Sequence, residues 1–141
     1  GSHPTAAVSR LARAPGVTVT GFVEDTGEWL RRANIAVAPL RIARGIQNKV
    51  LEAMAMARPV LVSPEAATGI EAEDGKHFAV AEGDRMMIGR ALALIDDPDK
   101  ARAMGAAARE FVLNEQSWPA MLAGLPQLLR PSDADPVRDA A

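Results

Sequence analysis

The stretch from Ala38 to Ser63, which reads APLRIARGIQNKVLEAMAMARPVLVS, constrains the fold of this chain more than any other part of the sequence. Within it, almost every residue from Asn48 to Ala57 is apolar, so a helix formed there has too little polar surface to lie in water. Residues 35–38 and 59–63 on either side are continuous apolar runs, as expected of parallel strands that are covered on both faces. The sequence therefore predicts a buried crossover helix between two buried strands.

Helical and extended patterns alternate along the whole chain. Runs of β-branched and apolar residues predict strands at 17–20, 35–38, 59–63 and 77–80. Periodic apolar residues and capping residues predict helices at 5–14, 26–33, 48–57, 84–95, 98–112 and 118–129. This alternation, with short connections, predicts an α/β fold with a right-handed parallel sheet flanked by helices.

Two capping signals and one core face are specific enough to be tested. Asp25 or Thr26 is expected to cap the second helix, and Asp97 followed by Pro98 is expected to begin the long helix after residue 97. The helix at 84–95 is expected to turn five apolar side chains toward the core, namely Met87, Ile88, Ala91, Leu92 and Ile95.

A candidate binding site lies at the start of the buried helix. Gly45 precedes that helix, and a glycine there lets backbone N–H groups approach an anion with the aid of the helix dipole. Asn48, Lys49 and Glu52 are spaced by three and four residues, so they share one side of its first turns. This arrangement indicates a phosphate at the helix mouth and a carboxylate one turn further in, which suits the hydroxyl groups of a ribose. Burying Glu52 in so apolar a helix without a partner would cost several kcal/mol, which also favours a binding role.

Each part of this site also has a purely structural interpretation. Lys49 and Glu52 can form a surface pair worth about 0.2–0.5 kcal/mol, with Gly45 serving only a turn. The loop at 64–75, which includes a possible helical turn, is either a second wall of the site beyond the strand ends or a plain connection.

Composition excludes several classes of function. The net charge of −2 and the aromatic content of 4% provide neither a basic surface nor stacking platforms, so no nucleic-acid partner is expected. Without cysteine the chain can form no disulfide, and His3 and His77 are too few for a metal site, so neither a metal nor a cofactor is expected. No apolar run approaches the ~20 residues that cross a bilayer, and a cytoplasmic location is expected. Gly1–His3 resembles the remnant of an expression vector.

Several segments together resemble a known enzyme family. These are VTGFV at 19–23, AVAPL at 36–40, KVLEAMA at 49–55 and RPVLV at 58–62. They are similar to the C-terminal, donor-binding domain of GT-B glycosyltransferases of family 4, whose fold is Rossmann-like. The resemblance covers roughly residues 17–125, and within the family it is nearest to bacterial sugar transferases associated with exopolysaccharide synthesis and PEP-CTERM protein sorting.

The resemblance implies roles for individual residues. The second glutamate of the family's Glu-x7-Glu motif, which holds the ribose of the nucleotide sugar, falls on Glu52. The first falls on Arg44, where a guanidinium replaces a carboxylate, so the catalytic residue is unknown and Arg44 either grips a phosphate or pairs with an acid elsewhere. The remaining implied contacts are with the diphosphate for Gly45, Ile46, Gln47 and Lys49, with the base for Phe22 and Val23, and beneath the ribose for Pro39 and Leu40.

The resemblance also implies that the chain is half of a two-domain enzyme. Residues 1–130 are expected to form the donor-binding domain without its first strand and helix, and 131–141 a disordered tail. The partners implied are a nucleotide-diphosphate sugar and a missing N-terminal acceptor-binding domain, which would place the enzyme at the inner membrane face. The isolated hexosyltransferase fragment is expected to be inactive and to self-associate through its apolar residues at 118–129. Alternatives are half of a nucleotide-sugar epimerase and a non-catalytic flavodoxin-like binding module.

Overall fold

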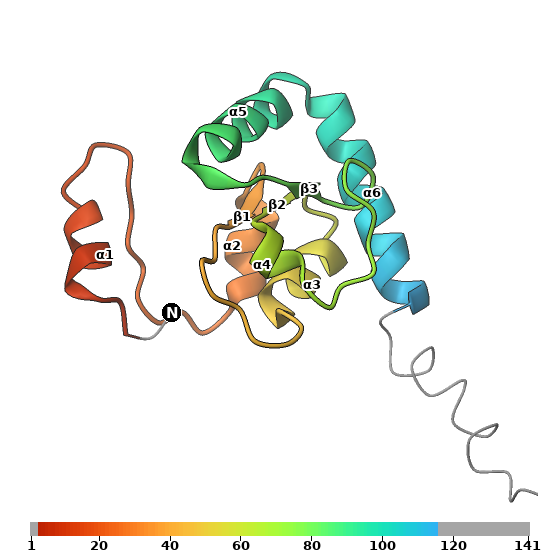
Figure 1. Cartoon of the computed structure of the whole chain (residues 1–141). Helices are drawn as coiled ribbons and strands as arrows, with labels where there is room; N and C mark the ends of the chain where they lie inside the picture. The colour runs from red at the N-terminus through yellow and green to blue at the C-terminus, as the bar shows by residue number, and fades with distance from the viewer. Residues whose placement is uncertain (1–2, 116–141) are drawn as a thin grey trace, which may run out of the picture.

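The computed structural model describes residues 3–115 and shows an α/β fold in which helices surround a small parallel sheet (Figure 1). The helices are α1 (Ala6–Leu11), α2 (Thr26–Arg32), α3 (Asn48–Ala55), α4 (Pro64–Ala67), α5 (Gly83–Asp96) and α6 (Pro98–Glu115). The strands are β1 (Ala36–Ala38), β2 (Val60–Val62) and β3 (Ala79–Val80).

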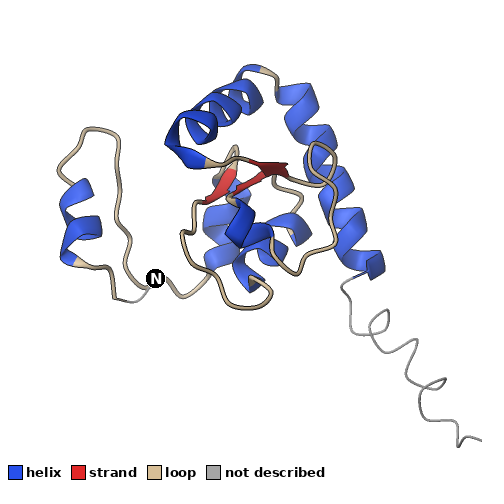
Figure 2. Cartoon of the chain, viewed as in Figure 1, coloured by secondary structure: helices blue, strands red, loops and turns tan. Residues whose placement is uncertain are grey.

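The sheet has the order β1-β2-β3, and both strand pairs are parallel. Figure 2 shows the strands in red among the helices. Ala36 lies opposite Val60, and Val62 lies opposite Val80. Because each parallel pair needs a crossover connection, α3 links β1 to β2, and α4 with its following loop links β2 to β3. The predicted fold class, a Rossmann-like parallel sheet flanked by helices, is confirmed.

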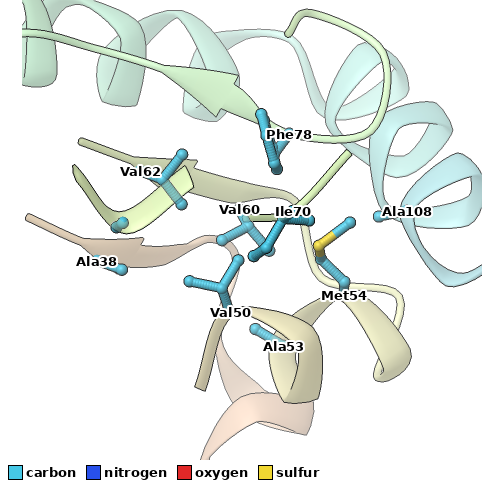
Figure 3. Close-up of a cluster of buried hydrophobic side chains, with 10 residues drawn as sticks. Ala38, Val50, Ala53, Met54, Val60, Val62, Ile70, Phe78 and Ala108 are labelled. Atoms are coloured by element: carbon cyan, nitrogen blue, oxygen red, sulfur yellow. The ribbon is translucent and has the colours of Figure 1, made fainter. Parts of the chain in front are cut away.

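The core lies on both faces of β2, whose residues are all buried. Val60 and Val62 pack with Val50 and Met54 of α3 on one face (Figure 3). Leu61, between them in the sequence, packs on the other face in a cluster that also contains side chains of α5 and α6. Successive strand residues point to opposite faces, so a strand covered on both sides must be apolar throughout, as the run at 59–63 indicates.

Helix α3 is held at its C-terminal end by its own backbone and by α6. The N–H of Arg58 donates to the carbonyl of Ala53 at 3.0 Å, and the N–H of Ala57 donates to that of Met54 at 2.9 Å. These two bonds form a Schellman motif, which leaves Ala57 in the left-handed region with φ of 53°. Helix α6 approaches so closely there that a β-carbon at Gly105 would lie 2.3 Å from the carbonyl oxygen of Ala57.

The strand predicted at 17–20 is wrong. Residues 17–20 form no strand and pair with none among the described residues, and Val17 is exposed. Helix α1 likewise buries no side chain, and Figure 1 shows it apart from the sheet. The cause is the absence of a neighbour, because a β-branched run becomes a strand only when its backbone finds a partner.

The predicted core face of α5 is only partly correct. Met87 and Ala91 do pack against the core, but the fully buried side chain of this helix is Leu94. The other three predicted core residues, Ile88, Leu92 and Ile95, are exposed. The segment is apolar around most of its circumference, so sequence periodicity does not select the side that faces α6 and β2.

Other boundaries follow the sequence prediction closely. Asp25 caps α2 by accepting from the N–H of Gly27 at 2.7 Å, and Asp97 caps α6 by accepting from the N–H of Lys100 at 3.0 Å. The helical turn expected within 64–75 is α4. Among residues 3–115, no helix is both long and apolar enough to cross a bilayer. The helix predicted at 118–129 and the tail predicted at 131–141 lie outside the described residues.

Candidate functional site

The carboxyl ends of the three strands open onto a pocket of about 180 Å³. Its walls come from the loop after β1, the start of α4 and the start of α5, and include Pro39, Leu40, Arg41, Ser63, Glu65, Glu82 and Asp84. The Ser63 hydroxyl donates to the carbonyl of Leu40 at 2.6 Å, which ties the ends of β1 and β2 together. Ligands of open parallel sheets bind at this edge, so we take it as the candidate site.

The loop that leads from β1 into α3 presents an open helix N-terminus. Gly45 has φ of +66°, a conformation that side chains disfavour, and it turns the chain into the helix. Gln47 is the N-cap residue, but its side chain makes no capping hydrogen bond, and the first turn of α3 contains no acidic residue. The first N–H groups of α3 therefore have no side-chain acceptor, in contrast to α2, which Asp25 caps.

The loop after β2 lies beside this glycine turn. A β-carbon at Gly69 would be 3.3 Å from Cγ1 of Ile46 and 3.9 Å from its backbone nitrogen. Ile70, the next residue, is buried in the core and fixes the loop in place. The loop at 64–75 therefore lies next to the glycine turn, as a second wall of the site would.

Lys49 and Glu52 are both exposed on α3. Lys49 lines a groove of about 370 Å³ between α2, β1 and α3, where Trp29 and Val37 also lie. No salt bridge joins Lys49 to Glu52, so a surface ion pair does not explain them. The argument from burial was wrong, however, because Glu52 stays in water and has no desolvation cost to offset.

Arg44 is exposed and has no acidic partner within residues 3–115. Its backbone carbonyl accepts a bond from the Gln47 side chain at 3.4 Å, which restrains the peptide group. Of the two roles that the sequence left open, pairing with an acid elsewhere therefore finds no support in this part of the chain.

The family described as Glycosyl transferases group 1 matches residues 1–97 of the chain. The chain belongs to this family. It is therefore a domain of a glycosyltransferase, an enzyme that moves a sugar to an acceptor. A comparison with curated proteins finds no match. The matched segment contains the whole candidate site of the glycosyltransferase, including the glycine turn, α3 and the loop at Gly69.

Two pairs of residues were assigned nucleotide contacts from the sequence, and in this glycosyltransferase domain only one pair lines the carboxyl-edge pocket. Pro39 and Leu40 line the carboxyl-edge pocket. Phe22 is 72% exposed and Val23 is half-buried, and neither lines that pocket. Their contact with a base stays a prediction.

Sequence reasoning missed several polar residues of the carboxyl-edge pocket. Arg41, Ser63 and Glu82 each follow a strand within three residues, and Asp84 lies in the first turn of α5. Position alone was the available signal, because residues just beyond the strands of a parallel sheet gather at one edge. Within residues 3–115, no group of three His, Cys, Asp or Glu side chains could hold a metal ion.

Proposed function

We propose that this domain binds a nucleoside-diphosphate sugar at the N-terminus of α3 and supplies the donor half of a glycosyltransferase site. The observation that carries the proposal is the uncapped start of α3, which follows a glycine with positive φ and adjoins the loop at Gly69. Free N–H groups and the helix dipole favour an anion at this point.

In this proposal, three charged side chains divide the work of holding the donor. Arg44 and Lys49 stand within a turn of the open N-terminus, and their positive charges suit a diphosphate. Glu52 lies one turn further along α3, where its carboxylate would accept hydrogen bonds from ribose hydroxyls. Together these groups would stabilise the negative charge that builds up on the departing nucleoside diphosphate.

The proposal extends to the organisation of the enzyme. We infer that residues 1–130 form a donor-binding domain, that a second domain binds the acceptor, and that the transferred group is a hexose. The resemblance of residues 39–60, PLRIARGIQNKVLEAMAMARPV, to exopolysaccharide-associated sugar transferases supports a role in bacterial glycan synthesis at the inner membrane face. Reaction in a cleft between two domains requires both substrates to be held in register, so donor and acceptor must be bound at the same time.

Calorimetry on the full chain tests the donor site. A panel of nucleoside diphosphates is titrated beside the matching nucleosides. Glu52→Gln should weaken binding of both ligand types by about 1–3 kcal/mol, because it alters the ribose contacts. Lys49→Ala should weaken binding of the diphosphates alone. Glu110→Gln, an exposed carboxylate on α6, is the matched control and should change neither.

The outcomes are distinct. Equal affinity of the wild-type chain and Glu52→Gln would remove Glu52 from the site. An equal loss for both ligand types in Lys49→Ala would limit Lys49 to stabilising its helix. If the wild-type chain binds no nucleoside diphosphate, the proposal fails as a whole.

A further inference from the structure

The side chain of Gln47 folds back onto the loop that precedes it. Its Nε2 donates to the carbonyl oxygen of Gly45 at 3.0 Å and to that of Arg44 at 3.4 Å. Both partners are acceptors, so the amide must present its nitrogen to them. One half-buried side chain thus holds two consecutive peptide groups of the glycine turn.

No other bond of this kind restrains the turn in the part of the chain that the structure describes. Residues 41–46 form no backbone–backbone hydrogen bond there, and Arg44, Gly45 and Ile46 are all exposed. A glycine in such a segment has wide conformational freedom, and fixing it on binding a ligand costs free energy. The bonds from Gln47 impose that order before any ligand arrives.

The direction of the two carbonyl groups also matters for an anion. Each carbonyl oxygen carries partial negative charge, and a carbonyl that turned toward a phosphate would repel it. By donating to both oxygens, Gln47 partly compensates their charge. The repulsion that these two carbonyls would exert on a nearby anion is thereby reduced.

We propose that Gln47 is a positioning residue for the diphosphate of the donor. Its side chain does not touch the ligand; it holds the Arg44 and Gly45 carbonyls so that the turn is ready to receive an anion. This inference rests on the proposed function for the identity of the ligand, and it assigns Gln47 a separate role within it. Preorganisation of this kind raises affinity by lowering the cost of ordering the loop.

The test compares Gln47→Met, which keeps the length of the side chain but has no donor, with the wild-type chain. Inorganic pyrophosphate is the first probe because it has no base or sugar, and a nucleoside with its diphosphate is the second. Gln47→Met should lower affinity for pyrophosphate and for the nucleoside diphosphate about tenfold and leave affinity for the nucleoside unchanged. Gln47→Glu, which sets a carboxylate against two carbonyls, should lose more.

NMR order parameters supply a readout that is independent of ligand. The backbone order parameters of Gly45 and Ile46 should fall in Gln47→Met, while those of β2 are unchanged. If the order parameters fall but pyrophosphate affinity stays the same, the order of the turn does not matter for binding and the inference is overturned. An equal loss for nucleoside and diphosphate would also overturn it.

These results separate the inference from the proposed function. A wild-type chain that binds pyrophosphate or a nucleoside diphosphate, together with a Gln47→Met variant that binds equally well, refutes the positioning role alone. A wild-type chain that binds none of these ligands removes the donor site, and the positioning role with it.

Discussion

Ile46 and Gly69 meet across the two loops of the candidate site, with Cγ1 of Ile46 3.3 Å from the point where a β-carbon of residue 69 would stand. Gly69 also has φ of +81°. The contact lets the loop after β2 support the glycine turn that precedes α3. A side chain at position 69 would therefore disturb a neighbour as well as its own backbone.

Gly69→Ala should lower both stability and pyrophosphate affinity. The positive φ costs about 1 kcal/mol once a β-carbon is present, and Ile46 must move by a few tenths of an ångström. Gly75→Ala is the matched control, because Gly75 has φ of +82° and no atom within 4 Å of the added carbon. Urea unfolding should show similar losses for both variants, and calorimetry should show weaker binding for Gly69→Ala only. Equal binding by the two variants would mean that the two loops act independently.

Arg44→Glu should abolish or strongly weaken diphosphate binding. The change reverses a charge beside the proposed anion site and should reduce affinity on the order of tenfold or more at low salt. The loss should shrink as salt is added, because the group is exposed. Arg13→Glu, an exposed arginine on the N-terminal segment, changes the net charge equally and should have little effect on calorimetric affinity. Unchanged binding by Arg44→Glu would show that Arg44 is not a phosphate ligand.

Gly105→Ala should be severely destabilising. The new β-carbon would lie 2.3 Å from the carbonyl oxygen of Ala57, a backbone atom that cannot rotate away. Helix α6 would have to shift off α3, at a cost of about 3 kcal/mol. Gly89→Ala on α5 is the control, since nothing lies within 4 Å there, and it should stabilise by about 0.5–1 kcal/mol through helix propensity. Chemical unfolding of both variants measures the difference, and a mild effect at Gly105 would contradict the close packing.

Ala57→Gly should stabilise the domain. Ala57 occupies the left-handed position of the Schellman motif with φ of 53°, which glycine adopts without strain. The expected gain is about 1 kcal/mol, seen as a higher urea midpoint. Ala55→Gly, two residues earlier and inside α3, should instead lose about 1 kcal/mol. A loss of stability in both variants would show that Ala57 carries no strain.

Asp74 should make the stability of the domain depend on pH in the acid range. Burial tends to raise the pKa of Asp74, but the bonds from the Val80 N–H at 2.8 Å and the Arg90 guanidinium at 2.7 Å outweigh it and lower that pKa below 3.8. A lowered folded-state pKa adds stability that is fully present above about pH 4 and disappears as the pH falls through the folded value.

Unfolding of the wild-type chain and Asp74→Asn at several pH values checks this. The difference in unfolding free energy should be at most about 1 kcal/mol at pH 7, because the pair with Arg90 is partly exposed, and should vanish in strong acid. Asp99→Asn, on the more exposed pair with Arg102, provides the comparison. A difference that grows as the pH falls would have the wrong sign.

The fold was largely predictable where local signals and burial agree. The strands around 36–38 and 60–62 are apolar throughout, and β2 is in fact buried on both faces. For β1 the prediction of burial on both faces is wrong, because Val37 is 46% exposed. The strand prediction at 17–20 failed because the preference of β-branched residues for strands takes effect only where a neighbouring strand pairs with their backbone. The prediction of the core face of α5 failed for a different reason. Apolar residues surround this helix, and only its packing against α6 determines that Leu94 is the buried side chain.

The glycine turn before α3 was predictable in position but not in detail. A glycine before a helix that follows a parallel strand indicates where the turn lies, and Gly45 does adopt a positive φ. The folded-back side chain of Gln47 was not visible in the sequence, because it depends on the rotamer and on where two carbonyls point. The exposure of Glu52 was also hidden, since composition does not state which side of an apolar helix faces water.

The two ends of α3 differ in how tightly the surrounding structure constrains them. At the C-terminal end, Ala57 and Gly105 touch so closely that neither position tolerates enlargement, and Arg109 donates to the carbonyl of Ala55. At the N-terminal end, the turn is exposed and is tied mainly by one glutamine. Substitutions in the turn should therefore disturb the scaffold less than substitutions at Ala57 or Gly105. A helix anchored at only one end leaves the sequence of its other end room to vary while the fold persists.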